Sequence, residues 1–190
     1  MNYGNTHSTI IEACRQGDRR AQFELYKLYS KAMYNVCLRM LKHEADAEDI
    51  LQRSFVDIFT KLDSFRQESA VGAWMKRIVI NNCINFLKKR RLHIQELDDR
   101  QHQIAAETVH INSQSLTVQT INEAVRELAD GYRVVFSLYA LEGYDHQEIA
   151  QILGITEATS KSQYSRAKQR LRLALQEKDI PDRYRIDKKR

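Results

Sequence analysis

Apolar residues recur every three or four positions along most of this chain, which is the spacing of amphipathic helices. The clearest example is a helix expected over about residues 46–62. Its inward stripe lies at positions i, i+4, i+7 and i+11: Leu51, Phe55, Ile58 and Leu62. A single proline and six glycines leave few breaks, so long helices joined by short turns are expected rather than sheets. The pattern predicts an all-α protein.

Capping residues delimit two helices near the start of the chain. Residues 1–8 are polar and are expected to fray, and Thr9 with Glu12 is expected to form a capping box for a short helix. Asp18 can cap a second helix, which is expected to run to about Leu41. The apolar residues of the second helix mix core with partly exposed positions. Such a stripe is far more often core than a ligand site.

A basic helix is expected from Trp74 onward, after a small polar loop at residues 66–72. Its inward positions are apolar: Ile78, Cys83 or Val79, Phe86 and Leu87. Residues 75–93 hold six Lys or Arg side chains and no acid, and this density of positive charge favours a phosphate-rich partner. Trp74 can be a stacking platform for an unpaired base, although composition favours a core anchor.

The stretch 143–175 predicts two helices joined by a tight turn. Asp145 can cap the first of them, and Glu148 completes a capping box. Gly154 suits the left-handed position that often ends a helix, and Thr156 is placed to cap the second helix. Two short helices crossing through a glycine-containing turn are typical of a helix-turn-helix.

The second helix of this pair is strongly basic. Its cations are Lys161, Arg166, Lys168, Arg170 and Arg172, against one acid, Glu157. A helix of this charge with polar side chains near its start suits the major groove of DNA. An ordinary helical hairpin with a solvated basic face is the alternative, and the turn, caps and charge together favour DNA binding.

Composition narrows the remaining possibilities. The chain has 190 residues and a net charge of +5, which is compatible with nucleic acid, an anionic membrane or neither. Cys14, Cys37 and Cys83 are far apart, so three reduced thiols are expected rather than a disulfide framework. The absence of a signal peptide and of an apolar run of transmembrane length predicts a cytoplasmic protein without stable membrane insertion. No P-loop, metal-ligand spacing or nucleophile elbow is found, so neither an enzyme nor a cofactor or metal is expected.

Three stretches of the sequence together form a recognisable pattern of motifs. They are DAEDILQRSFVDIF at 46–59, FRQESAVGAWMKRIVINNCINFLKKRR at 65–91 and the helix-turn-helix at 146–165. In this order and spacing they resemble a sigma factor of bacterial RNA polymerase, of the small extracytoplasmic-function type that keeps only the second and fourth conserved regions. The resemblance implies two helical domains joined by a flexible linker. The implied parts are region 2 at 9–93, the linker at 94–116, region 4 at 117–176 and a basic tail at 177–190.

The resemblance also implies functional residues. An acidic and amide face would dock on core RNA polymerase: Asp46, Glu48, Asp49, Gln52, Arg53 and Val56. Acids at this helix start are equally favoured by the helix dipole alone. A loop and the helix after it would capture a flipped base of the minus-ten element and hold its strand: Arg66, Ser69, Trp74, Lys76, Arg77, Asn81, Asn85, Lys88 and Lys89. The helix-turn-helix would read the minus-thirty-five element: Glu157, Thr159, Lys161, Ser162, Gln163, Ser165 and Arg166.

Three residues depart from the pattern of the family. Arg53 stands where the family usually has an acid, Ser160 replaces a usual valine, and Tyr164 replaces a smaller aliphatic residue. If Ser160 is buried, its hydroxyl is expected to bond a backbone carbonyl one turn earlier.

The implied partners are core polymerase, promoter DNA and an anti-sigma factor. One alternative is a helix-turn-helix regulator that binds a palindromic site without polymerase. Another is a sigma mimic that sequesters an anti-sigma factor. This second alternative leaves the acid-free run at 75–93 without a purpose.

Overall fold

The computed structural model describes residues 3–66, 70–90 and 117–179. Over these residues every regular element is helical and no strand occurs, so the predicted all-α class is confirmed. The chain divides into two compact units, Met1–Arg91 and Leu92–Arg190. Each unit has its own buried core, and the two are described separately. The predicted linker at 94–116 lies outside the described residues.

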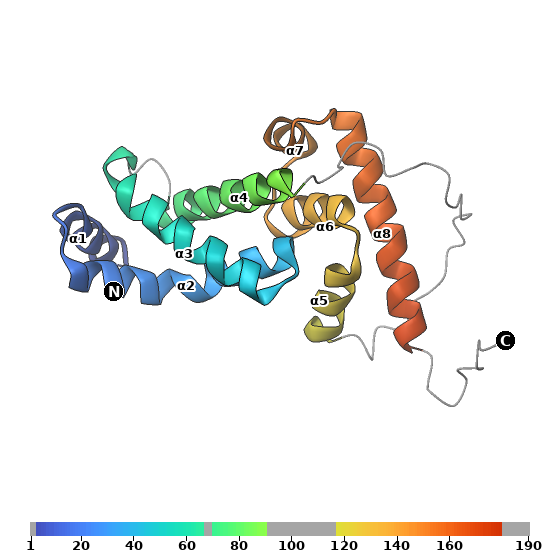
Figure 1. The fold of residues 1–190 in the computed structure, drawn as a ribbon, viewed down its shortest axis with the longest axis horizontal. Helices are drawn as coiled ribbons and strands as arrows, with labels where there is room; N and C mark the ends of the chain where they lie inside the picture. Colours follow the sequence, from blue (N-terminus) through green and yellow to red (C-terminus); the bar gives the residue numbers. More distant parts are fainter. Residues whose placement is uncertain (1–2, 67–69, 91–116, 180–190) are drawn as a thin grey trace. The chain divides into compact units, whose positions relative to one another are not determined.

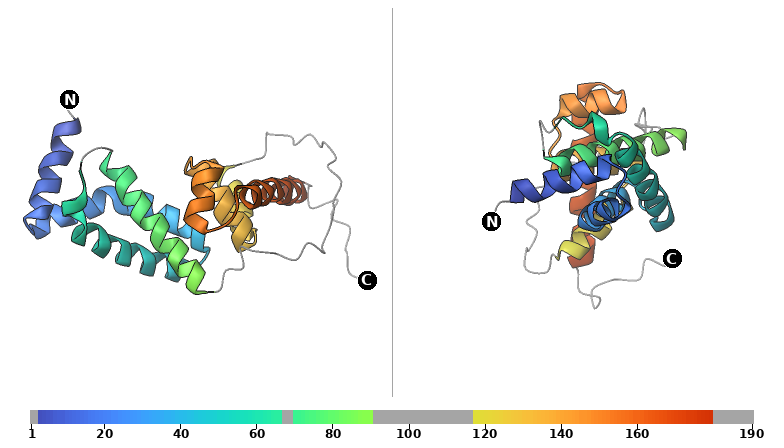
Figure 2. Two further views of the ribbon diagram at one scale, coloured as in Figure 1. Left: turned by 90° about the horizontal axis from the view of Figure 1, so that it is seen from above. Right: turned by 90° about the vertical axis from the view of Figure 1, so that its left-hand side faces the viewer.

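The first unit is a bundle of four helices with one short 3₁₀ turn. Its elements are α1 (Tyr3–Arg15), α2 (Arg19–Leu41), α3 (Glu44–Thr60), η1 (Leu62–Ser64) and α4 (Val71–Lys89). Helices α2, α3 and α4 pack on one another along their lengths, while α1 crosses α2 at one end and contacts η1 (Figures 1 and 2). This arrangement brings the connection between α3 and α4 beside α1.

The capping predictions for this unit have different outcomes. Asp18 caps α2 as expected, because its carboxylate accepts from the backbone N–H groups of Arg20 and Ala21 at 2.7 and 3.4 Å. The predicted capping box at Thr9 is wrong, because α1 begins at Tyr3 and Thr9 lies inside it. Burial of Ile11 on the next turn holds this helix without a cap at Thr9.

The predicted apolar stripe is buried from Leu51 to Leu62, although α3 ends at Thr60 and Leu62 lies in η1. The inward face of α4 is rotated relative to the prediction: Ile78 and Phe86 are only half-buried. The helix begins at Val71 rather than Trp74 and packs on two neighbours. Its buried face is therefore wider: Val71, Met75, Val79, Ile80, Cys83, Ile84 and Leu87.

The second unit is built around one long helix. Its elements are α5 (Val118–Glu127), α6 (Asp130–Phe136), the π-helical segment η2 (Ser137–Leu141), α7 (His146–Leu153) and α8 (Glu157–Asp179). Helices α5, α6 and α7 all pack on α8 (Figure 1). The fully buried Arg133 of α6 donates to the carbonyl of Leu128 at 2.8 Å and to the carboxylate of Asp130, which ties α6 to the end of α5.

The predicted helix-turn-helix is formed by α7 and α8. Asp145 and Glu148 make the reciprocal capping box, at 2.8 and 2.9 Å. Gly154 ends α7 with a φ of 72°, a left-handed conformation in which a side chain would be strained. Thr156 caps α8 by accepting from the N–H of Thr159 at 3.0 Å. These local predictions are confirmed.

Candidate nucleic-acid interface

Helix α8 has one side in the core and one in solvent. Its buried residues follow helical spacing: Ser160, Gln163, Ala167 and Leu171. Lys161, Ser162, Ser165 and Arg166 are exposed on the other side. Exposed donors in the first turns of the second helix are what base-edge and phosphate contacts in a major groove require.

The exposed side of α8 carries local interactions of its own. The Glu157 carboxylate lies 2.7 Å from Lys161 Nζ, and this hydrogen bond together with the opposite charge raises the pKa of Lys161. The hydroxyl of Ser162 donates to the carbonyl of Thr159 at 3.0 Å. Lys161 is therefore charged, but it must share or exchange Glu157 to meet a phosphate. Arg166 is exposed on the same side of α8, so both cations are available as candidate phosphate contacts.

The structure corrects the prediction that Gln163 contacts DNA. Only 5% of it is exposed, and it faces α6. A Cβ added at Gly131 would come within 2.8 Å of Gln163 Oε1, so the glycine permits this close approach. The position was predictable, since Gln163 lies three residues after Ser160 and four before Ala167. We therefore remove Gln163 from the DNA-contacting set.

Ser160 is fully buried, and its partner is not the backbone carbonyl that was predicted. Its Oγ lies 2.9 Å from Nδ1 of His146, the first residue of α7. The His146 ring is stacked on Tyr139 at 4.3 Å between centroids and meets the edge of Tyr164 at 5.7 Å. Ser160 and Tyr164 thus belong to one cluster that joins α7 to α8.

Replacing Ser160 by alanine is expected to lower the free energy of unfolding of the second unit by about 1–2 kcal/mol, because the His146 nitrogen loses its buried partner. Urea unfolding followed by circular dichroism measures the change. The matched control is Ser165→Ala on the exposed side of the same helix, for which a change within about 0.5 kcal/mol is expected. Equal effects of the two substitutions would contradict the assignment.

The candidate polymerase-binding residues lie on α3, and all but one of them are exposed. Glu48, Asp49, Gln52, Arg53 and Val56 are exposed. The remaining member of the set, Asp46, is half-buried and accepts from Arg90 at 2.6 Å. Asp46 therefore connects the start of α3 to the end of α4.

The candidate minus-ten residues lie on and before α4. The exposed members are Arg66, Arg77, Asn81, Asn85, Lys88 and Lys89. Lys76 and Trp74 are half-buried, and Trp74 packs on Phe65 with 5.3 Å between ring centroids. Ser69 lies outside the described residues. Trp74 thus combines a contact within the fold with a partly accessible ring.

A groove of about 370 Å³ between α3 and α4 brings the two candidate sets together. Arg53 and Val56 of the polymerase set line it, as do Asn85 and Lys89 of the minus-ten set. Asn82 also lines it, although the predicted minus-ten set includes only the nearby Asn81 and Asn85. Its amide donates to Ser54 at 3.1 Å and to Asp57 at 2.8 Å, which joins α4 to α3.

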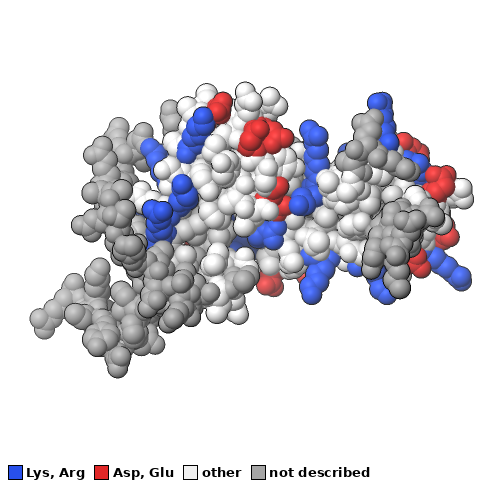
Figure 3. All heavy atoms as spheres, turned by 180° about the vertical axis from the view of Figure 1, so that it is seen from behind, with Lys and Arg blue, Asp and Glu red and all other residues white. Residues whose placement is uncertain are grey.

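The face shown in Figure 3 carries mixed charge. Lys and Arg side chains stand among Asp and Glu side chains rather than forming one continuous basic patch. A DNA-facing surface therefore has to be identified from the exposed side chains of particular helices.

Other kinds of site find little support within the described ranges. No three His, Cys, Asp or Glu side chains there are grouped as metal ligands. None of the helices in those ranges is both long and apolar enough to cross a membrane. The three cysteines are buried without disulfides, and hydrogen bonding to Cys37 together with burial raises the pKa of Cys83. These buried thiols are poor nucleophiles.

Comparison with known sequences gives two family matches. The model of sigma-70 region 2 matches residues 25–93, and that of sigma-70 region 4 matches residues 119–171. Together these matches cover more than half of the chain. The region 2 match lies in the first unit except for its last two residues, and the region 4 match lies in the second unit.

Individual relatives agree with these matches. The chain is 26% identical to the ECF RNA polymerase sigma factor SigM of Mycobacterium tuberculosis, over 90% of this chain and 87% of the relative. It is 29% identical to SigM of Bacillus subtilis, over 84% of this chain and 97% of the relative. Among solved structures, the sigma factor RpoE of Bartonella quintana, in complex with the anti-sigma factor NepR, has a TM-score of 0.53 and 27% identity. That match covers 80% of this chain and 95% of RpoE.

Proposed function

Because this chain belongs to the extracytoplasmic-function sigma factors of bacterial RNA polymerase, we propose that it docks core polymerase through α3, opens the minus-ten element through α4 and reads the minus-thirty-five element through α8. As a sigma factor it directs transcription initiation and is a transcription factor rather than an enzyme. In this proposal region 2 spans 9–93, region 4 spans 117–176, and the protein works in the cytoplasm.

The observation that carries the proposal is the division of α8 into two sides. The caps at Asp145 and Thr156 and the turn at Gly154 support the orientation of a recognition helix. Lys161 and Arg166 are exposed on the outward side of its first turns. The minus-thirty-five contacts proposed here are Glu157, Thr159, Lys161, Ser162, Ser165 and Arg166.

The proposal for region 2 is supported by exposure on two adjacent helices. The outward side of α3 presents Glu48, Asp49 and Gln52, while that of α4 presents Arg77 and Asn81. The acids on α3 suit a protein surface, and the cations on α4 suit a negatively charged nucleic-acid strand. We assign polymerase docking to the acidic side and minus-ten contacts to the basic side.

The direct test is transcription with purified core polymerase. The complete chain is mixed with core enzyme and a library of genomic promoters, and the transcripts are mapped. Promoter-dependent transcripts are expected, and their absence from every promoter would reject the proposal. Gel shifts with and without core enzyme separate the alternatives, since a regulator binds a palindrome alone and a sigma mimic binds no promoter in either case.

Replacing Asp49 by lysine is expected to weaken binding to core polymerase about tenfold, because charge reversal at a complementary interface adds repulsion. The affinity is measured by titrating labelled protein with core enzyme. Glu24→Lys, the same charge change at an exposed position of α2, serves as the matched control and is expected to bind normally. Equal affinity of wild type and Asp49→Lys would remove Asp49 from the interface.

An anti-sigma factor is the third proposed partner. The related sigma factor of Bartonella quintana is described in complex with one, and we extend that type of partnership to this chain. Copurification from the native host tests it.

A further inference from the structure

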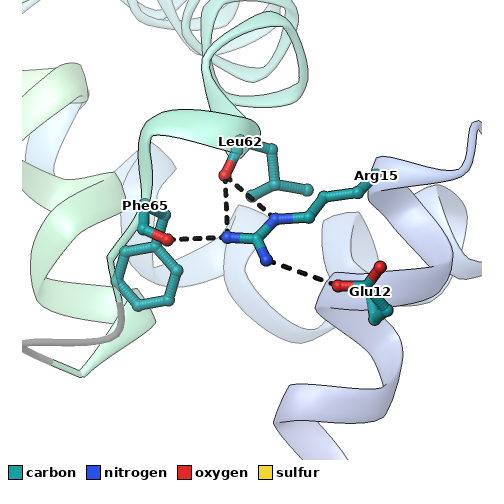
Figure 4. Close-up of polar contacts among 4 residues, drawn as sticks. All are labelled: Glu12, Arg15, Leu62 and Phe65. Atoms are coloured by element: carbon teal, nitrogen blue, oxygen red, sulfur yellow. Dashed lines mark hydrogen bonds and ion pairs between the residues drawn. The ribbon is translucent and has the colours of Figure 1, made fainter.

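The guanidinium group of Arg15 holds the backbone between α3 and α4 from outside that segment. Arg15 is the last residue of α1, and its Nη2 donates to the carbonyl of Phe65 at 2.6 Å. Nε and Nη2 both donate to the carbonyl of Leu62 at 3.3 Å, and Nη1 meets the Glu12 carboxylate at 3.3 Å. Figure 4 shows the planar fork reaching from α1 to both carbonyls. Only a side chain with several donors in one plane can bridge two carbonyls in this way.

The residue that Arg15 holds is itself part of a packed pair. Phe65 is 5% exposed, and its ring packs on Trp74 in the first turns of α4. The backbone of Phe65 is thus fixed by α1 while its side chain is fixed by α4. Arg66 follows directly after it in the chain. Two of the proposed minus-ten residues, Arg66 and Trp74, therefore depend on where Phe65 lies.

The far end of this connection is held separately. Gly72 in α4 lies so close to α2 that an added Cβ would meet the ring of Tyr29 at 2.9 Å. Burial raises the pKa of Tyr29, consistent with tight packing at this point. The backbone at the start of α4 is therefore seated on α2 without help from Arg15, so Arg15 acts on Trp74 only through the Phe65 ring that packs on its side chain.

Resting on the function proposed above, we propose that Arg15 is a positioning residue for promoter opening: it fixes the carbonyls of Leu62 and Phe65, and through the Phe65–Trp74 pair it sets the place of Trp74 and Arg66 at the minus-ten element. Helix α1 lies before residue 25, where the family match begins. This support therefore comes from a part of the chain that the matched family sequence does not include.

A direct phosphate contact by Arg15 is the rival explanation. The guanidinium already serves two carbonyls and one carboxylate, and only 23% of the side chain is exposed. A pre-organised donor set loses its function when its geometry is lost, even if the charge stays. A phosphate contact, in contrast, depends mainly on charge. Lysine at this position separates the two explanations.

The first measurement uses the free protein, without polymerase or DNA. Trp74 is the only tryptophan, so its emission reports the Phe65–Trp74 contact directly. Arg15→Ala and Arg15→Lys are both expected to shift Trp74 emission to the red and to increase its quenching by acrylamide. Glu12→Ala, which removes the ion pair but leaves both carbonyl contacts, is expected to match wild type. An unchanged Trp74 spectrum in Arg15→Ala would overturn the proposal.

The second measurement uses holoenzyme assembled from core polymerase and the complete chain. Opening is followed with 2-aminopurine placed in the minus-ten element of a promoter mapped for the wild type. Arg15→Ala is expected to bind core polymerase normally but to open the promoter about tenfold more slowly, the equivalent of one charge-assisted hydrogen bond. The salt dependence of opening is expected to stay unchanged, and Arg15→Lys should not restore the rate. Arg19→Ala, which removes an exposed positive charge at the start of α2, should open at the wild-type rate.

The outcomes distinguish this inference from the function on which it rests. If the wild-type protein fails to bind core polymerase, the proposed function is rejected. The Trp74 measurement then still tests whether Arg15 holds Phe65 against Trp74. The positioning role is overturned if Arg15→Ala opens the promoter at the wild-type rate. It is also overturned if Arg15→Lys restores the rate fully and Arg15→Ala shows a shallower salt dependence. If Arg15→Ala lowers the folded fraction, Arg15→Lys becomes the deciding variant, because it keeps the charge and the aliphatic stem.

Discussion

Replacing Lys161 and Arg166 together by alanine is expected to weaken binding of the holoenzyme to the minus-thirty-five element on the order of 100-fold. Both side chains are exposed on the outward side of α8. If each neutralises one phosphate, the slope of log affinity against log salt should become shallower by about 2. Lys161 is already paired with Glu157 at 2.7 Å, so its contact with a phosphate has to compete with that ion pair.

The matched control removes the same charge from the same helix. Arg170 and Arg172 are also exposed and lie about three and a half turns or more beyond the helix start at Glu157, at least one turn past Arg166. Arg170→Ala with Arg172→Ala is expected to change affinity much less, because only the first turns of a recognition helix enter the groove. Affinity is measured by fluorescence anisotropy at several salt concentrations. An unchanged footprint in the Lys161 and Arg166 double variant, or equal losses in the two double variants, would show that the recognition surface lies elsewhere.

Replacing Arg133 by alanine is expected to lower the free energy of unfolding of the second unit by about 3 kcal/mol. Arg133 is 1% exposed, and its bond to the Leu128 carbonyl is buried. The substitution leaves that carbonyl without this donor and opens a cavity of several missing atoms. Asp130 is 54% exposed, so solvent screens its ion pair and the pair adds little to the total.

Two spectroscopic signals separate the units in this experiment. Trp74 lies in the first unit, so its fluorescence follows the unfolding of that unit, whereas circular dichroism follows both. Arg133→Ala should move the dichroism transition of the second unit to lower urea and leave the Trp74 transition in place. Arg170→Ala, an exposed arginine on α8, should move neither. A dichroism midpoint equal to that of wild type would contradict the structural role of Arg133.

The confirmed predictions share one property, which is that both partners lie within a few residues of each other. The caps at Asp18 and Thr156 and the box formed by Asp145 and Glu148 join groups two or three positions apart. Chain geometry alone brings such groups together once a helix starts. The prediction at Thr9 failed although it was also local. Thr9 is suited to a cap, but the residues before it are also helical, so no helix begins there.

The errors at Gln163 and Ser160 concern groups whose surroundings come from another helix. Gln163 reads as a polar contact residue, but its place on α8 turns it toward Gly131 of α6. The buried hydroxyl of Ser160 needed a partner, and its Oγ lies 2.9 Å from Nδ1 of His146 in α7. For Gln163 the side of the helix was wrong, whereas for Ser160 the burial was anticipated and only the partner was wrong, because that partner belongs to α7.

By itself, the sequence determined the helical class, the main helix boundaries, the helix-turn-helix and the family, because periodicity, caps and motif spacing are properties of nearby residues. Tertiary structure alone decided that Arg15 reaches Phe65, fifty residues away, and that Arg90 reaches Asp46, forty-four residues away. Hydrogen bonds over such separations exist only when packed cores bring distant backbone into reach, and the spacing of residues along a chain carries no signal for them. The helix-turn-helix could therefore be identified from the sequence, whereas the support that α1 gives to the backbone after α3 could not.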